Sequence, residues 1–381
     1  MYLVDVQPHR SQRLERLLKV TRHAPLVFVY TGGSLPAYAE PSLSLSLNWN
    51  ATKHIVISDA SRPGWLPGDV EYLDARQFRP ADLQQLVGED FPYPLEFRNG
   101  FWVRTIERFH ILNEWSSIAG QGTFVHSELD NLCLGIQGAI DRIDGISGFA
   151  VPRESLIQAV ASVVLVNTVR HRPFDNLLDF IKSNSRMGNE MEIIAAYLDA
   201  SANIDGNSLP TISQVSGHPP VDTDKRFPWR ALGVADLGGL FDAASVGRWL
   251  LGVDPRNRLG MRVLNLEEHP RTTGSTASFM YSVINEHMTL TSVVTGEEFR
   301  LYNLHVHSKI FHRLLRPRFS KILVARANKG KKTTISHASR EWFFSETKRW
   351  ARYLFSWAFL FRWARFTLRQ IERLRFFRQP G

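Results

Sequence analysis

Residues 123–131 read Thr-Phe-Val-His-Ser-Glu-Leu-Asp-Asn, a short apolar run that ends in two acids. The β-branched and aromatic residues of 123–126 predict a strand. Glu128 and Asp130 follow directly, so their side chains are expected where this strand leaves the sheet. In an open α/β sheet, ligands bind outside the carboxyl ends of the strands. The stretch therefore predicts both a sheet and the edge at which a site lies.

The acidic pair has two interpretations. Carboxylate oxygens suit a hard divalent cation, and such an ion could hold a pyrophosphate and offset the charge of a leaving nucleoside diphosphate. However, Ser127, Asp130 and Asn131 are also good turn and helix caps. The stretch alone leaves both interpretations open.

The sequence on either side alternates between apolar runs and helical patterns. Further strands are predicted over residues 26–30, 54–58 and 162–167. Helices are predicted over residues 36–49 (interrupted near Pro41), 103–118, 173–182 and 189–198. This alternation favours an α/β fold with a Rossmann-type mixed, mostly parallel sheet and helices on both faces.

A pair of histidines lies in the late segment Leu304-His305-Val306-His307-Ser308-Lys309. On a strand, His305 and His307 would point to the same face, about 7 Å apart. A neutral imidazole can complete a metal site begun by carboxylates, and Lys309 could meet a phosphate. Two histidines alone are more often ordinary surface or core residues than metal ligands, so a metal-binding role for them depends on the acidic pair.

Two glycine-flanked acidic segments lie between these motifs, at residues 239–244 and 252–257. They suit a binding loop in which Asp242 and Asp254 face a sugar or an acceptor. The same spacing is equally typical of two tight turns joined by a helix over residues 243–251.

Taken in order, these motifs resemble a group of largely uncharacterised bacterial and viral proteins regarded as GT-A-type glycosyltransferases. The resemblance covers roughly residues 25–312 and is carried by the ordered set rather than by one motif. Its segments are Arg108-Phe109, 124–131, 241–247, 252–257 and 303–309.

The resemblance implies a GT-A fold, a nucleotide-sugar donor, and Mn²⁺ or Mg²⁺ at an acidic motif that here begins with Glu128 instead of aspartate. The longer Glu128 side chain can reach the ribose or a water while Asp130 binds the metal. A late histidine, His307 or His305, would join the metal.

Further roles follow from the resemblance. Arg104, Arg108, Glu128 and Lys309 would bind the donor, which would pass its sugar to a glycan or a lipid-linked acceptor. An inverting enzyme also needs a carboxylate base, for which Glu190 and Glu192 are the candidates. A retaining enzyme needs no base there, and an acid at a helix start also simply offsets the macrodipole.

Charge is distributed unevenly along the chain. From Lys309 onward there are 19 Lys/Arg and 3 Asp/Glu, a balance of +16; the totals of 46 and 37 leave 27 and 34 before it, a balance of −7. The mildly acidic body argues against nucleic-acid binding by that part of the chain.

The tail predicts an amphipathic helix that lies on an anionic membrane surface. It could instead pack on the catalytic domain or on a partner helix, and nucleic-acid binding by it stays open. One stripe contains Tyr353, Trp357, Leu360, Ala364, Thr367, Ile371 and Leu374. The opposite side carries Arg362, Arg365, Arg369 and Arg373.

The expected organisation is an N-terminal segment (1–24), a GT-A-like catalytic domain (25–312), a basic linker (313–340) and a basic aromatic helix (341–379). The single cysteine, Cys133, excludes an intrachain disulfide. Residues 1–22 lack the apolar core of a signal peptide, and no run reaches the roughly 18–20 apolar residues of a spanning helix. These features predict a cytoplasmic protein, peripheral on the inner face of the cell membrane.

Two other functions are compatible with the same residues. A nucleotidyltransferase or phosphohydrolase would use the acids and histidines for metal-dependent phosphate chemistry without sugar transfer. A non-enzymatic, membrane-associated assembly protein with a degenerate transferase fold would bind no nucleotide through a metal.

Overall fold

The computed structural model describes most of the predicted catalytic domain. The described residues are 24–93, 95–142, 146–155, 157–167, 172–201, 206–212, 233–251, 279–284, 287–292, 296–307, 309 and 311. Asp254, the basic linker 313–340 and the helix predicted over 341–379 lie outside them, as do all but the last residue of segment 1–24.

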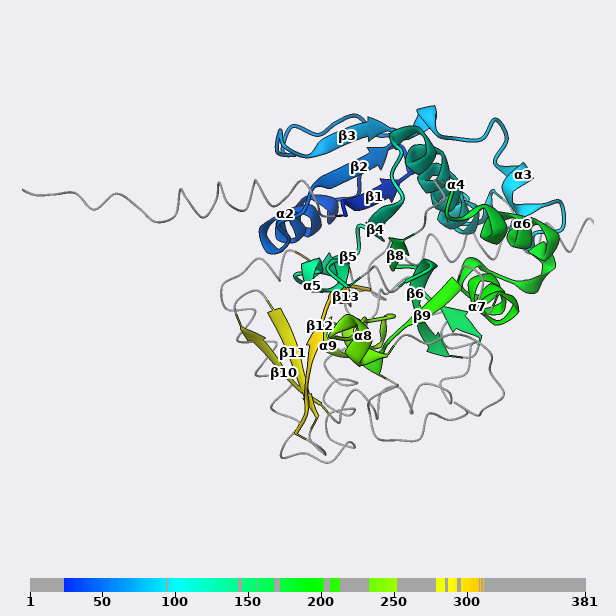
Figure 1. Cartoon of the computed structure of the whole chain (residues 1–381). Helices are drawn as coiled ribbons and strands as arrows, with labels where there is room; N and C mark the ends of the chain where they lie inside the picture. Colours follow the sequence, from blue (N-terminus) through cyan, green and yellow to red (C-terminus); the bar gives the residue numbers. More distant parts are fainter. Residues whose placement is uncertain are drawn as a thin grey trace, which may run out of the picture. The chain divides into compact units, whose positions relative to one another are not determined.

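The central sheet has eight strands. They are β1 (Leu26–Tyr30), β2 (His54–Ser58), β3 (Glu71–Asp74), β4 (Thr123–Ser127), β6 (Gly148–Ser155), β7 (Gln158–Ala159), β8 (Val163–Asn167) and β9 (Gly206–Leu209). Their order is β3-β2-β1-β4-β8-β6-β7, and β9 also pairs with β6 (Figure 1). The first four strands in the order are parallel, whereas β8 is antiparallel to both neighbours. The prediction of a mixed, mostly parallel sheet is confirmed.

Helices cover both faces of this sheet. Alternate side chains of β1 point to opposite faces, so their packing partners show which helices lie on each face. Val27 and Val29 join the apolar cluster that includes α4, α6 and α7, whereas Leu26 and Phe28 join the cluster that includes α2 and α5. The helices are α2 (Ala39–Trp49), α3 (Gln84–Val87), α4 (Phe101–Ala119), α5 (Gln137–Ile140), α6 (Asp175–Ser183), α7 (Glu190–Ala200), α8 (Val234–Leu237) and α9 (Ser245–Leu251). Short 3₁₀ turns lie at Ala75–Gln77, Phe97–Asn99 and Ser185–Met187.

Two predicted helices show how local sequence sets their ends. Gly120 ends α4 in the left-handed conformation, at φ 62°, as its position after the apolar pattern predicts. The interruption predicted near Pro41 is wrong, because α2 begins at Ala39 and Pro41 lies in its first turn. A proline is tolerated there, since the backbone N–H groups of a first turn have no partner within the helix.

Two smaller strand groups complete the described part. β5 (Asn131–Cys133) pairs antiparallel with β13 (Asn303–His305), which places His305 opposite Asn131. β10 (Phe279–Ile284), β11 (His287–Ser292) and β12 (Glu298–Leu301) form a three-stranded sheet. The β5–β13 pair therefore brings the late histidine segment beside the acidic motif.

Cys133 lies in β5 and is buried. Burial raises the pKa of its thiol to about 12, so the thiol is a poor nucleophile. No helix among the described residues is long and apolar enough to cross a membrane.

Asn50 ties α2 to the β5 segment, so Asn50→Ala is expected to destabilise the protein. Its amide donates to the carbonyls of Ser46 (2.8 Å) and Cys133 (3.1 Å) and accepts from the Ile136 N–H (2.7 Å). Truncation leaves these buried groups unpaired and should lower the free energy of unfolding by about 2–4 kcal/mol, measured by urea denaturation.

Gln85→Ala is the control for this change, because Gln85 lies exposed on α3 and should cost less than about 0.5 kcal/mol. An Asn50→Ala variant as stable as the Gln85→Ala variant would contradict the proposed tie.

Candidate metal centre

The acidic motif lies at the point where the strand order of the sheet reverses. β1 is flanked by β2 on one side and by β4 on the other, so the ends of β1 and β4 border a topological switch point. Such points are the usual ligand crevices of open α/β sheets. Glu128 follows β4 directly, and its N–H donates to the Ser162 carbonyl at 2.8 Å.

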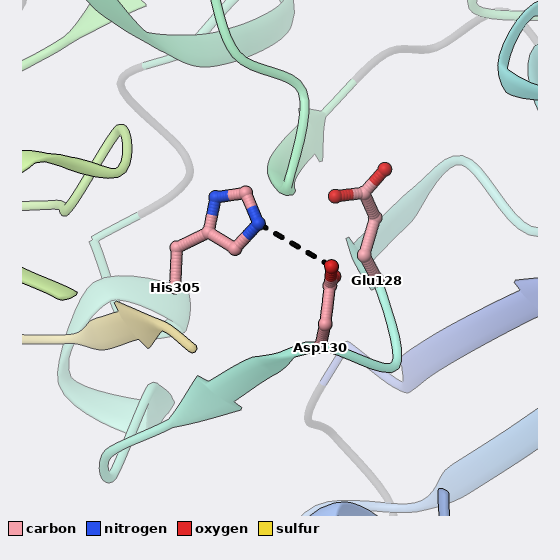
Figure 2. Close-up of side chains that lie close together, drawn as sticks. All are labelled: Glu128, Asp130 and His305. Carbon is pink, nitrogen blue, oxygen red and sulfur yellow. Dashed lines mark ion pairs between the residues drawn. The ribbon is translucent and has the colours of Figure 1, made fainter. Parts of the chain in front are cut away.

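Glu128, Asp130 and His305 converge at this edge (Figure 2). One potential ligand atom of each lies within 4.8 Å of the others. The His305 Nε2 atom is 3.4 Å from Asp130 Oδ2, and the two side chains are 10% and 14% exposed. Two carboxylates and an imidazole are thus held together at the margin of the protein interior.

Backbone pairing fixes the histidine relative to the acids. The Val306 N–H donates to the Asp130 carbonyl at 2.7 Å, next to the β5–β13 ladder. The buried Asn303 amide donates to the side-chain oxygen of Asn131 at 2.8 Å. Asn131 in turn donates to Ser127, the last residue of β4.

Asp242 anchors the same segment from the opposite side and is only 1% exposed. Its carboxylate accepts the N–H groups of Ala244, Val246, Gly247 and His305 at 2.8 to 3.0 Å. The sequence pattern placed Asp242 toward a sugar, and the structure corrects this position. The Asp242 carboxylate caps the start of α9 and accepts the backbone N–H of His305.

His307 does not belong to the three-residue cluster. β13 ends at His305, and the His307 N–H turns back to the His305 carbonyl at 2.9 Å. The expectation of one continuous strand with both rings on one face is therefore wrong. The two ring centroids are 5.9 Å apart.

The two acids of the cluster are each paired with a cation. Arg108 contacts Glu128, and the Lys309 ammonium contacts Asp130. Burial raises the pKa of Glu128, but Arg108, then His305 and Lys309, outweigh burial and hold it below its usual value. Burial lowers the pKa of Lys309 to about 8. Lys309 has a left-handed backbone, at φ 57°, which is uncommon for a lysine.

Arg108 is shared between Glu128 and Glu190. Its side chain is 6% exposed, so it is buried between two carboxylates rather than open to a donor. Burial raises the pKa of Glu190 to about 7, although Arg108 opposes the shift. This position makes Glu190 a partner of Arg108, whereas the sequence suggested an acceptor-facing base.

Glu192, the other candidate base, caps α7. Its carboxylate accepts the Asn189 N–H at 3.0 Å, while the Asn189 side chain accepts the N–H of Glu192. This reciprocal capping box explains an acid at this position without catalysis.

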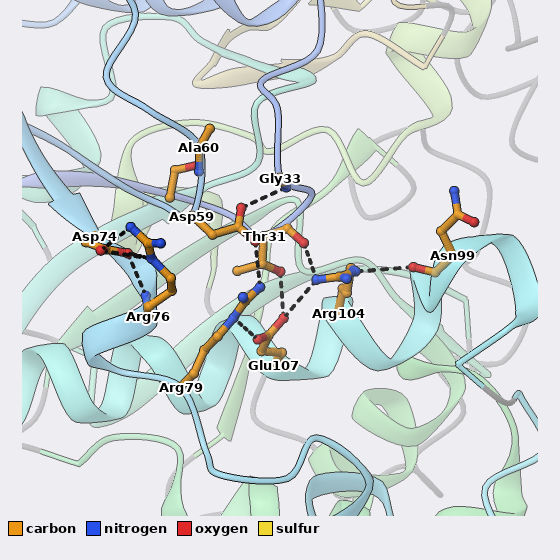
Figure 3. A network of polar contacts seen from close by, with 11 residues as sticks. Thr31, Gly33, Asp59, Ala60, Asp74, Arg76, Arg79, Asn99, Arg104 and Glu107 are labelled. Atoms are coloured by element: carbon orange, nitrogen blue, oxygen red, sulfur yellow. Dashed lines mark hydrogen bonds and ion pairs between the residues drawn. The ribbon is translucent and has the colours of Figure 1, made fainter.

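A second polar network lies beyond the carboxyl ends of β1 and β2 (Figure 3). The fully buried carboxylate of Glu107 accepts the Thr31 hydroxyl at 2.6 Å and Arg79 Nε at 2.5 Å. Arg79 also reaches Asp59 at 2.9 Å, and Asp59 accepts the Gly33 N–H at 2.9 Å. Glu107 precedes Arg108 on α4. Consecutive residues of this helix therefore hold this network, which is one half of the site, and the acidic cluster at Glu128, which is the other.

Arg104 joins this network and does not contact the acidic cluster in the described part. It donates to the Thr31 carbonyl and, at 3.2 Å, to the Asn99 carbonyl. No pattern in the sequence pointed to Glu107, Arg79 or Asp59, because their proximity depends on which strand ends become neighbours.

A hollow of about 380 Å³ opens beside this network. It is lined by residues 33–37, Glu40, Ala60, Ser61 and Trp65, among others. Tyr38 follows the first of these segments, and the Lys309 ammonium lies 5.4 Å from the centre of its ring. Lys309, which pairs with Asp130, therefore contacts a residue that is next in sequence to the lining of the hollow.

No family model matches this chain. No curated protein matches it either. Among solved structures, the chain aligns with a galactosyltransferase, LgtC, in complex with donor and acceptor sugar analogues. The alignment has 11% identity and a TM-score of 0.33, and covers 55% of this chain and 84% of that one. A likeness this low does not establish a shared fold.

The donor set of the cluster fits a hard divalent cation. Mg²⁺ and Mn²⁺ take carboxylate oxygens, and Mn²⁺ also accepts an imidazole nitrogen. His305 Nδ1 is buried with no hydrogen-bond partner in the described part of the chain. A cation bound at Asp130 would compete with the Lys309 ammonium, so Lys309 would have to release that carboxylate.

The buried Glu190 carboxyl should make stability depend on pH. A folded-state pKa of about 7, raised above the usual 4.5 by burial, means that ionisation destabilises the fold. The stability that the neutral Glu190 carboxyl contributes is complete below about pH 4.5 and is lost as the pH rises through 7. Glu190→Gln should therefore become more stable relative to wild type over this range, by a few kcal/mol at most.

Urea denaturation of the metal-free protein at pH values from 5 to 8 measures this difference. Glu89→Gln is the control, because Glu89 is exposed and should follow wild type. A Glu190→Gln variant whose stability parallels wild type at every pH would contradict the raised pKa.

Proposed function

We propose that this protein is a metal-dependent glycosyltransferase of the GT-A type that uses a nucleotide-sugar donor. The observation that carries the proposal is the convergence of Glu128, Asp130 and His305 at the β1–β4 switch point. Convergence there of two acids with a histidine distant in sequence is the arrangement that the motif order implied.

In this proposal Glu128, Asp130 and His305 hold Mn²⁺ or Mg²⁺. When bound, the ion would stabilise the negative charge on the departing nucleoside diphosphate. Lys309, displaced from Asp130, would move to a donor phosphate as a compact positive charge. Its contact with Tyr38 supports this, because Tyr38 directly follows Ala37, a residue that lines the hollow.

Arg108 positions Glu128 in this scheme and does not bind the donor itself. The buried guanidinium keeps Glu128 ionised, and Glu190 keeps the guanidinium in place. Arg104 acts on the donor side by fixing the Thr31 carbonyl at the end of β1.

The acceptor in this proposal is a glycan or a lipid-linked glycan, and Asp254 would lie toward it. The basic aromatic helix at 341–379 would hold the enzyme on an anionic membrane surface at the cytoplasmic face. In the helix that the sequence predicts here, the arginines would fall on the side opposite the aromatic stripe, and this pattern supports attachment.

Binding of UDP-sugars or GDP-sugars should be metal-dependent and should need Asp130. We expect one of these donors to raise the melting temperature with Mn²⁺ present and to have little effect without it. Asp130→Ala should remove this stabilisation, because it deletes a central ligand of the cluster. Differential scanning fluorimetry measures both effects.

Glu89→Ala is the matched acid-to-alanine control and should keep the donor-dependent shift. If the donor raises the melting temperature equally without metal and in Asp130→Ala, the enzyme proposal is contradicted. Donor cleavage to a free sugar phosphate and nucleotide, without transfer to any acceptor, would favour phosphate chemistry instead.

Replacing Arg362, Arg365, Arg369 and Arg373 together by glutamine should weaken vesicle binding by the full-length protein. Each basic residue near an anionic leaflet contributes on the order of 1 kcal/mol, so the loss should be large at low salt. Co-sedimentation with anionic vesicles measures it, and neutral vesicles serve as the control. Equal binding by wild type and variant would overturn membrane attachment through this helix.

A further inference from the structure

The hollow beside β1 and β2 contains the elements of a base-recognition site. Trp65 offers an aromatic side chain, and Glu40 is the ionisable side chain among the residues that line it. We propose that this hollow selects a guanine base, through Glu40, so that the donor is a GDP-sugar. This inference rests on the proposed glycosyltransferase function and names its substrate class.

The walls of the hollow are held before any ligand binds. On one side, the Gly33 N–H is bound to Asp59, which Arg79 links to the buried Glu107 (Figure 3). On the other, the Ala60 N–H donates to the Ser58 hydroxyl at 3.2 Å, and its carbonyl accepts the Tyr72 hydroxyl at 2.8 Å. A hollow with fixed walls can discriminate between ligands of similar size, because little reordering accompanies binding.

Glu40 is available for a ligand. It lies exposed in the first turn of α2, where it also complements the helix dipole. Within the described part of the chain, no hydrogen bond or ion pair engages its carboxylate. Stabilisation of the helix dipole explains an acid in this turn. It does not explain why the acid lines a hollow together with Trp65.

The chemistry of a carboxylate separates the four common bases. Guanine presents a ring N–H beside an amino group, two donors that match the two oxygens of one carboxylate. Adenine and cytosine place a ring acceptor beside their amino group, and uracil places its N–H between two carbonyl oxygens. Each of these three bases turns at least one lone pair toward the carboxylate, which costs binding.

Trp65 supplies the sequence-independent part of recognition. It is half-buried and packs against the apolar cluster beneath α2, so its ring is held in place. Base–aromatic stacking contributes for every base, because every base has a π-face. Trp65 therefore strengthens binding, and Glu40 decides between bases.

The location of the hollow agrees with a donor that spans both halves of the site. Ala37 lines the hollow, Tyr38 follows it, and the Lys309 ammonium lies over the Tyr38 ring. Lys309 also contacts Asp130. A base in the hollow would thus be joined through its ribose to phosphates near Lys309 and the cation ligands.

Calorimetric titration of the full-length protein with GDP, ADP, CDP and UDP in the presence of Mn²⁺ tests this proposal. We expect GDP to bind about tenfold or more tightly than ADP, a comparison that keeps purine stacking nearly constant. Glu40→Gln should narrow or reverse this ratio, because a glutamine amide offers the acceptor and donor that adenine requires. Trp65→Ala should weaken all four diphosphates, and Trp65→Phe should restore part of the loss.

The control, Glu89→Gln, removes an exposed acid outside the hollow and should keep the wild-type ratio. ADP or UDP binding as tightly as GDP, or a ratio unchanged in Glu40→Gln, would overturn guanine selection. If all four diphosphates bind equally and only with metal, the transferase proposal stands and the base assignment falls. If none binds with or without metal, both fall.

Discussion

The buried guanidinium of Arg108 is the constraint on which the site depends. A charge in the interior is tolerated only where opposite charges and hydrogen bonds compensate its lost hydration. Arg108 meets this condition through Glu128 at the end of β4 and Glu190 at the start of α7. Both carboxyl groups accept from the same guanidinium, so α4, β4 and α7 are fixed relative to one another by these contacts as well as by packing.

The neighbouring residue extends this constraint to the other half of the site. Glu107 is completely buried and is satisfied by Thr31 and Arg79, which connect it to the loops after β1 and β2. Consecutive residues of α4 therefore place a carboxylate in the Thr31–Arg79 network and a guanidinium beside Glu128. The fold holds the two regions in register through a single rigid element.

The sequence was informative wherever structure is decided locally. The strands β1 and β2 occur at the predicted residues, and β4 and β8 differ by one residue at one end. The helices α4 and α7 also lie within two residues of their predicted bounds. In contrast, β3 reads Glu-Tyr-Leu-Asp and is half-exposed throughout, so it carries no apolar signal.

The acidic motif and its histidine segment were recognisable, but the roles of individual side chains were not. Asp242 and Asn303 become partners through β5–β13 pairing, which joins residues far apart in the chain. The choice of His305 over His307 depends on where β13 stops, a boundary that tertiary contacts set. Glu190 and Arg108 form an ion pair 82 positions apart, which no spacing rule anticipates.

The three-residue pairing of β5 with β13 has a consequence for the order in which the site forms. Asn131 and Asn303 are separated by 172 positions, so this ladder closes a very long loop. Chains synthesised from the N-terminus form their early contacts first, and contacts distant in sequence form late because of loop-closure entropy. The early strands and α4 can assemble while the imidazole is still missing. A nascent or truncated chain would therefore possess the two acids without the imidazole, and the candidate metal cluster would be completed only at the end of folding.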